Sequence, residues 1–194
     1  MREHLYPLYP EKIVVFIDGA NLLAGIKRAL GEYFRYDIFK LVKLLTKERR
    51  LLRAYYYDGI YPYPSDHLSA EEKERFLEER KKKEEFVRIL RGKGITAKLI
   101  ELKMMRVREE WVPIQKGVDI KIATDALVLG FRNAYDVAVF VSGDGDLAEV
   151  LQELKALGKK VEVAAFKEVL SEDLLNIADR LWFLEEYTEY IKLH

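Results

Sequence analysis

Near-continuous apolar runs of the β type alternate with helix-patterned segments along this chain. We expect strands over the ranges 12–17, 51–57, 95–102, 136–141 and 160–165. Strands that are apolar on both faces are typical of a parallel sheet that helices cover on both sides. The pattern therefore predicts an α/β fold with a mainly parallel central sheet of roughly five strands.

The segments between these strands carry apolar residues at i, i+3 and i+4 spacing. We expect helices over the ranges 21–30, 37–47, 69–91, 118–129 and 146–157. Helix 69–91 follows a serine cap, with glutamates early and arginines late, which is the order that the helix dipole favours. We interpret 103–116 as a strand continuation or a hairpin arm with a loop. Residues 1–194 are expected to form one domain, with 169–194 as a C-terminal helix and arm.

The composition is that of a globular protein without a strong overall charge. Hydrophobic residues make up 49% and charged residues 34%, which is enough apolar material for a core. Lys plus Arg and Asp plus Glu both number 33, so an anionic partner has to be held by a local patch. We find no apolar run of transmembrane length and no secretory signal, and we expect a cytoplasmic protein without a membrane partner.

Several kinds of catalytic site are excluded or disfavoured by the residues available. Cysteine is absent, which excludes thiolate nucleophiles, iron–sulfur clusters and cysteine zinc sites. The three histidines are His4, His67 and His194, so histidine-based triads and zinc sites are disfavoured. The phosphate-loop, dinucleotide and nucleophile-elbow motifs are also missing. Carboxylates remain, and they suit hard cations such as Mg²⁺ and Mn²⁺.

Aspartates follow the predicted strands. Asp18 comes after the first strand, and Asp144 and Asp146 come after the fourth, in the sequence SGDGD. Right-handed crossovers place the carboxyl ends of parallel strands at one edge, where open α/β sheets bind ligands. Asp119 lies in the first turn of helix 118–129, whose N-terminus reaches the same edge. We therefore predict a catalytic acidic cluster holding one or two Mg²⁺ or Mn²⁺ ions, because clustered carboxylates need a cation to neutralise them.

Four further residues are candidates for supporting this cluster. Asp125 lies about 9 Å along the helix from Asp119, so we expect it to brace a loop rather than to bind metal. Asn21 supports the site or merely caps a helix. Ser142 is a ligand or a turn hydroxyl, and Asp58 supports the site or only ends the second strand. Each acid taken alone also has a simple capping or turn role, but independent caps need not gather at one edge.

At these positions the sequence resembles the NYN domain, in its LabA-like branch, within the PIN-like nuclease superfamily. The matching segments are VVFIDGANL at 14–22, KGVDIKIATDAL at 116–127, VSGDGDLAEVLQELKALGKKVEV at 141–163 and LLNIADRLWFL at 174–184. The resemblance implies a three-layer α/β/α PIN-like fold and a metal-dependent nuclease, usually acting on RNA. It also implies an acidic metal-binding set and two supporting residues, namely Asp18, Asp119, Asp144 and Asp146 with Asn21 and Ser142.

Substrate contacts are expected where basic residues are interleaved with an aromatic residue beside the Asp119 motif. These residues are Lys103, Arg106, Arg108, Trp111 and Lys116. Such a pattern suits single-stranded RNA, through phosphate contacts and base stacking. The alternative is a solvated hairpin in which Trp111 packs. Tyr61 and Tyr63 either stack bases or close a hydrophobic edge or dimer contact. Helix 69–91 presents a solvated charged face or a homodimer contact.

We predict a metal-dependent ribonuclease that hydrolyses phosphodiester bonds. Two alternatives stay open at this stage. One is a regulator that binds nucleic acid or protein and keeps the acidic site without turnover. The other is a metal-dependent phosphatase or nucleotidase acting on small phosphate esters.

Overall fold

The computed structural model describes residues 10–66, 68–108 and 110–193, and its centre is a fully parallel sheet. The six strands lie in the order β3-β2-β1-β6-β7-β8. Their bounds are β1 Lys12–Asp18, β2 Arg50–Ile60, β3 Thr96–Glu101, β6 Val137–Val141, β7 Lys160–Ala165 and β8 Arg180–Phe183. The predicted parallel sheet is confirmed, and β8 from the C-terminal segment adds a strand to the roughly five expected.

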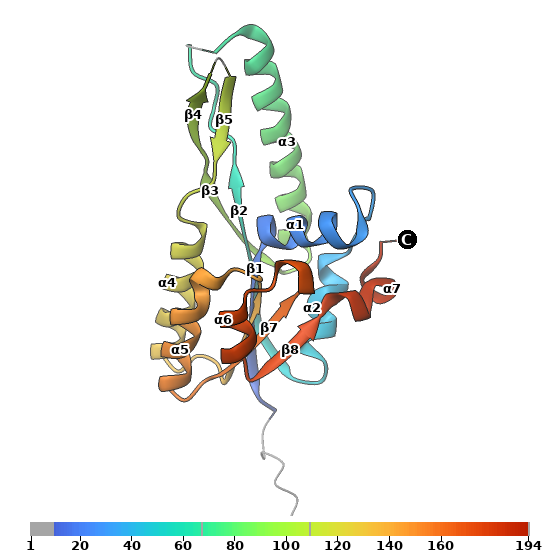
Figure 1. Ribbon diagram of the computed structural model, residues 1–194, viewed down its shortest axis with the longest axis vertical. Coiled ribbons are helices and arrows are strands. Elements are labelled where there is room, and N and C mark those ends of the chain that lie inside the picture. The colour runs from blue at the N-terminus through green and yellow to red at the C-terminus, as the bar shows by residue number, and fades with distance from the viewer. Residues whose placement is uncertain (1–9, 67, 109, 194) are drawn as a thin grey trace, which may run out of the picture.

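Helices cover both faces of this sheet (Figure 1). One face is covered by α1 (Gly19–Leu30), α2 (Ile38–Thr46), α3 (Ala70–Gly92) and α7 (Thr188–Ile191). The other is covered by α4 (Val118–Phe131), α5 (Ala148–Ala156) and α6 (Glu172–Ile177). The described residues also form three short 3-10 helices, η1 Gly145–Leu147, η2 Lys167–Val169 and η3 Leu184–Tyr187. The three-layer α/β/α fold is therefore confirmed.

Strand β1 explains why the strands read as continuous apolar runs. Ile13, Val15 and Ile17 pack into the core beneath α1, α2 and α3, whereas Val14 and Phe16 pack into the core beneath α4 and α5. Successive side chains of a strand point to opposite faces, so a strand buried on both faces is apolar at every position. The polar Asp18 ends this run at the carboxyl edge of the sheet.

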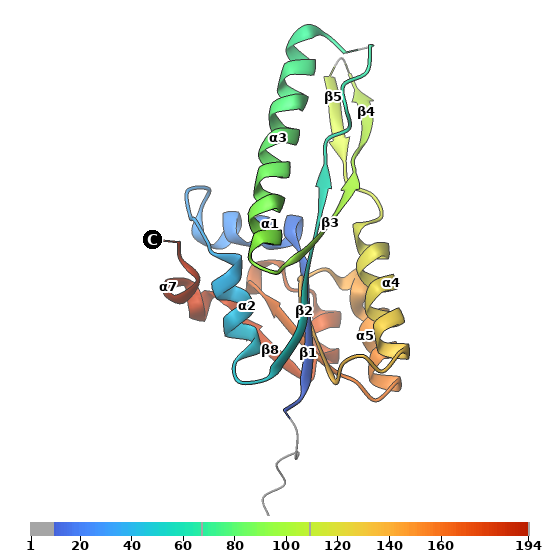
Figure 2. The ribbon, with the colours of Figure 1, turned by 180° about the vertical axis from the view of Figure 1, so that it is seen from behind.

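A long arm extends beyond the carboxyl edge. Figures 1 and 2 show α3 lying beside the antiparallel hairpin of β4 (Lys103–Val107) and β5 (Glu110–Ile114). The hairpin interpretation of 103–116 is thus confirmed. Helix α3 begins after Ser69, whose hydroxyl accepts a hydrogen bond from the Glu72 amide while the Glu72 carboxylate accepts one from the Ser69 amide. This capping box confirms the predicted serine cap.

Several predicted boundaries were wrong. Helix α5 begins at Ala148 rather than at 146, because 145–147 form η1, and α4 runs to Phe131 rather than to 129. The second strand does not end at residue 57, because Asp58, Gly59 and Ile60 pair in register with the last residues of β3. Helix α1 begins at Gly19 rather than at 21, because the Asp18 carboxylate caps it by accepting the Asn21 amide at 3.0 Å. Asn21 is therefore not the cap of this helix.

None of the helices in the described ranges is long and apolar enough to cross a membrane. The histidines at 4, 67 and 194 and the N-terminal residues 1–9 lie outside the described residues.

Candidate acidic site at the carboxyl edge

Four aspartates reach the carboxyl edge from three separate elements. Asp18 is the last residue of β1, and Asp119 lies in the first turn of α4. Asp144 caps η1 in the loop after β6, and Asp146 lies within η1. Their charges act on one another: burial raises the pKa of Asp119, and the negative charges of Asp144 and Asp146 raise it further. The structure thus brings the four predicted acids to one edge.

Asp18 is the most buried of the four, with 4% of its surface exposed. Burial raises the pKa of Asp18 to about 6, against the lowering effect of the Asn21 amide. The negative charges of Asp119 and Asp58 add to the rise. A cation close to Asp18 would lower its pKa and so stabilise the ionised carboxylate.

No lysine or arginine within the described ranges forms an ion pair with these four acids. The two other aspartates near the edge differ in this respect. Asp58 pairs with Lys83 of α3, and Asp125 pairs with Lys98 of β3 at 2.6 Å. The lysines and arginines of the described chain therefore do not neutralise the negative charge of these four aspartates.

A divalent cation fits this donor set in charge and in chemistry. Hard cations prefer carboxylate oxygens, and Mg²⁺ is commonly held by one or two carboxylates with water completing its shell. Across the part of the chain that the structure describes, no three acidic or histidine side chains gather as a ready-made metal-binding group. One or two ions at this edge would therefore each take one or two of the four carboxylates directly, with water as the remaining ligands.

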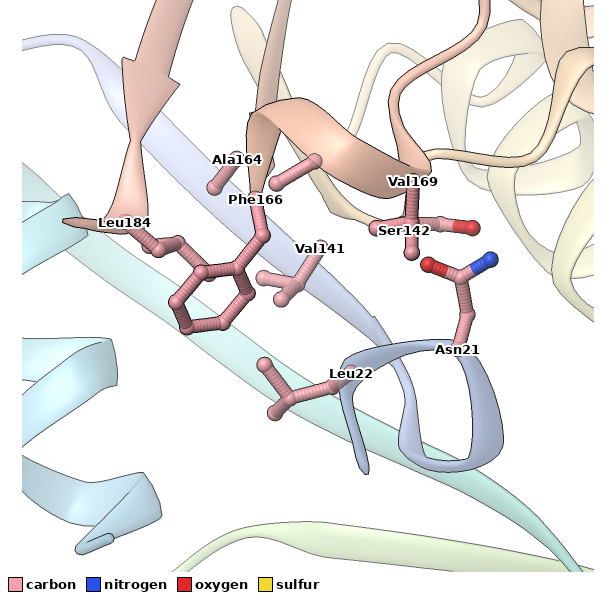
Figure 3. A pocket seen from close by; sticks show the side chains of 9 residues that line it. Asn21, Leu22, Val141, Ser142, Ala164, Phe166, Val169 and Leu184 are labelled. Atoms are coloured by element: carbon pink, nitrogen blue, oxygen red, sulfur yellow. The ribbon is translucent and has the colours of Figure 1, made fainter. Parts of the chain in front are cut away.

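Asn21 and Ser142 hold the loop that carries Asp144. The Asn21 Oδ1 accepts the Gly143 amide at 2.8 Å, and the Ser142 Oγ accepts the Asp144 amide at 3.2 Å. Figure 3 shows the Asn21 side chain reaching from α1 toward Ser142 and Val169. Gly143 is required here, because a Cβ would overlap the Val169 carbonyl oxygen. Polar contacts and close backbone packing thus fix the loop against α1.

Asp58 and Asp125 act as braces. Asp58 accepts the Tyr56 hydroxyl at 2.6 Å and the Gly59 amide at 2.7 Å, in addition to its pair with Lys83. Asp125 accepts the Tyr57 hydroxyl at 2.9 Å. Burial alone would raise the pKa of Asp125, but the hydrogen bonds from Lys98 and Tyr57 outweigh it and lower the pKa. Both carboxylates tie β2 to a neighbouring element.

Tyr56 links the Asp58 brace to the turn that carries Asp18. Its hydroxyl occupies the place where a Cβ on Gly19 would stand, so only glycine fits after Asp18. The glycine of the FIDGAN segment is therefore explained by this close approach rather than by a positive φ angle.

The predicted basic residues lie on the hairpin of the arm, except Lys116, which lies between β5 and α4. Lys103, Arg106, Arg108 and Lys116 are exposed, and Arg106 is directly opposite the half-buried Trp111 in the hairpin.

Tyr61 and Tyr63, in the loop between β2 and α3, both pack on α3. Tyr61 contacts Phe76 with ring centroids 5.0 Å apart, and the Arg80 guanidinium lies 3.8 Å from the centre of the Tyr63 ring.

Lys83 is a residue that our sequence interpretation missed. We had expected α3 to present a solvated charged face there, but its ammonium turns inward to Asp58. A signal was present in the sequence, because residue 83 shares a helical face with the buried Phe76, Val87 and Leu90.

Comparison with known proteins decides the family. The NYN domain model matches residues 12–185. The chain belongs to the NYN domain family. NYN domains are part of the PIN-like nuclease superfamily, whose members are generally nucleases and typically use divalent metals.

Two solved structures are similar to this NYN domain. One is VPA0982, a protein of unknown function from Vibrio parahaemolyticus RIMD 2210633, with a TM-score of 0.68 and 22% identity over 97% of this chain and 100% of that one. This likeness supports the fold alone. MurG from Acinetobacter baumannii has a TM-score of 0.41 and 12% identity over 89% of this chain and 40% of that one. No curated protein matches the sequence.

Proposed function

We propose that this NYN domain, which we assign to the LabA-like branch, is a metal-dependent ribonuclease. The observation that carries the proposal is the set of four aspartates at the carboxyl edge whose charges no lysine or arginine of the described chain neutralises. Asp18, Asp119, Asp144 and Asp146 would hold one or two Mg²⁺ or Mn²⁺ ions. A bound ion supplies activated water and stabilises the charge of a phosphoryl transition state.

The chain's own residues have distinct tasks in this proposal. Asn21 and Ser142 hold the Asp144 loop at a fixed distance from α1, which positions one side of the site. Asp58 ties β2 to α3 through Lys83, and Asp125 ties α4 to β2 through the Tyr57 hydroxyl and to β3 through Lys98. These residues would therefore support the site without contacting the substrate.

The substrate we propose is single-stranded RNA. The exposed basic side chains of the hairpin would contact phosphates, and Trp111 with its neighbour Arg106 offers a stacking surface for bases. Because the chain has no net charge, this local patch is where attraction for RNA would arise.

The direct test is cleavage of end-labelled single-stranded RNA in Mn²⁺, in Mg²⁺ and in EDTA. We expect cleavage that requires metal and that Asp144→Asn abolishes. The matched control is Asp136→Asn, the same change at the opposite end of β6, where the side chain accepts the Lys12 amide at 2.7 Å. This control is expected to cleave like the wild type.

Four results would count against the proposal. Cleavage that persists in EDTA would exclude a metal-dependent site, and equal cleavage by Asp144→Asn would exclude the acidic edge. Release of phosphate from mononucleotides without cleavage of the RNA would favour a phosphatase or nucleotidase instead. RNA binding without turnover in any metal would favour a regulator.

A further inference from the structure

A hollow lies beside the acidic edge, within the arm. It has a volume of about 300 Å³ and opens between α3, the end of β2 and the hairpin. Ile60, Leu102 and Pro113 supply apolar walls, and Glu79, Lys83 and Gln115 supply polar groups. The volume is at the small end of the range usual for ligand pockets, roughly 300–1,000 Å³.

The hollow and the acidic edge share a wall. Asp58 lines the hollow, and its carboxylate accepts the Tyr56 hydroxyl at 2.6 Å. The same hydroxyl occupies the space above Gly19, directly after Asp18. The Tyr56 side chain therefore lies between Asp58 in the wall of the hollow and the turn that carries Asp18, and the Asp58 charge is close enough to raise the pKa of Asp18.

Two of the polar groups are held by ion pairs within α3 or to β2, Glu79 with Lys82 and Lys83 with Asp58, whereas Gln115 is exposed. Lys83 is held by its ion pair with Asp58, and 28% of its side chain is exposed. Gly59 lacks a side chain where a Cβ would overlap Leu102, which lets Leu102 and Gln115 approach the β2 backbone. Three polar side chains thus line one space between apolar walls. Lys83 is a hydrogen-bond donor, Glu79 is an acceptor, and the amide of Gln115 can act as both.

We propose that this hollow binds one nucleobase of the RNA, the base adjoining the phosphate at the acidic edge. This inference rests on the proposed nuclease function. A flat heterocycle suits the apolar walls, and its edge carries the mixed donors and acceptors that the three polar side chains would meet. A bare phosphate suits it poorly, because the carboxylates of Asp58 and Glu79 lie in the same lining. The hollow would therefore set a base preference.

Nucleotide titration tests this without cleavage. In the absence of metal, AMP, CMP, GMP and UMP are added separately to the ¹⁵N-labelled protein, and its amide resonances are followed by NMR. We expect at least one monophosphate to shift the amides of Gly59, Ile60 and Leu102. Gln115→Leu should weaken that binding about tenfold, which is the usual scale for losing one hydrogen-bonding partner. Gln152→Leu, the same change on an exposed position of α5, should bind like the wild type.

Two results would overturn the nucleobase site. Either none of the four monophosphates shifts these amides, or Gln115→Leu binds as tightly as Gln152→Leu. The same spectra show whether each variant is folded, because a correctly folded variant keeps the wild-type peak positions for residues away from the arm.

The two proposals fail separately. Nucleotide binding in the hollow without RNA cleavage in any metal would refute the nuclease and leave the base site standing. Metal-dependent cleavage whose base preference is the same in Gln115→Leu and the wild type would refute the base site and leave the nuclease standing.

Discussion

At the scale of single residues, the aspartates near the carboxyl edge are of two kinds, those that form an ion pair with a lysine and those that do not. Asp58 and Asp125 have lysines within ion-pair distance and serve to join elements. Asp18 is more buried than either but has no such partner within the described ranges, and its ionisation is opposed by burial and by neighbouring charges. A buried acid that is costly to ionise reduces stability, and such groups are common at functional sites.

Asp18→Asn should therefore stabilise the metal-free protein in a way that depends on pH. The folded-state pKa of Asp18 is about 6 and its ordinary value is 3.8, so the folded state binds more protons between these pH values. The wild-type free energy of unfolding then falls as pH rises from about 4 to about 6 and stays lowered above that, by at most about 3 kcal/mol. Asparagine still caps a helix, so the variant loses this penalty and keeps the cap.

Urea unfolding in EDTA at pH 4 and pH 8 measures this effect. We expect the variant to be more stable than the wild type at pH 8 and the difference to shrink toward zero at pH 4. A variant that is less stable at pH 8, or a difference that is the same at both pH values, would contradict the account of Asp18.

At the scale of elements, predictions from sequence succeeded where one strand or helix determines the outcome. The apolar run of β1 and the position of Asp119 in the first turn of α4 placed both acids at the carboxyl edge correctly. The end of β2 was missed because it is set by pairing with β3, which lies far along the chain. Lys83 was missed because its partner Asp58 comes from another element. Contacts between distant segments leave little trace in local periodicity.

The hairpin is the element that we expect to bind the RNA backbone. Replacing Arg106 and Arg108 together with alanine should weaken binding of single-stranded RNA and make it less sensitive to salt. The plot of log affinity against log salt concentration has a negative slope, and the loss of two phosphate contacts should make it less steep by about 1.4. Fluorescence anisotropy of a labelled oligomer over a range of salt concentrations gives this slope.

The matched control replaces two exposed arginines away from the arm, Arg50 at the start of β2 and Arg132 at the end of α4. Its salt slope should equal that of the wild type. If both double variants changed the slope equally, the hairpin would have no special role in binding.

At the scale of the whole molecule, the sheet and the arm have separate parts in the proposed function. The sheet, buried on both faces, positions the acids at its carboxyl edge, and the arm of α3 and the hairpin stands beyond that edge (Figure 1). RNA held along the arm would lead directly to the acids. This division is compatible with a net charge of zero, because the exposed basic side chains that would attract RNA lie on the hairpin and the aspartates without lysine or arginine partners lie at the edge.

The central claim is that the acidic edge holds a divalent cation, and calorimetric titration with Mn²⁺ tests it most directly. We predict that wild-type protein and Asp136→Asn bind Mn²⁺ with the same affinity. Asp119→Asn should bind at least about tenfold more weakly, because it loses one carboxylate of the set. Equal Mn²⁺ affinity for Asp119→Asn and the wild type, or no binding by the wild type, would contradict the claim.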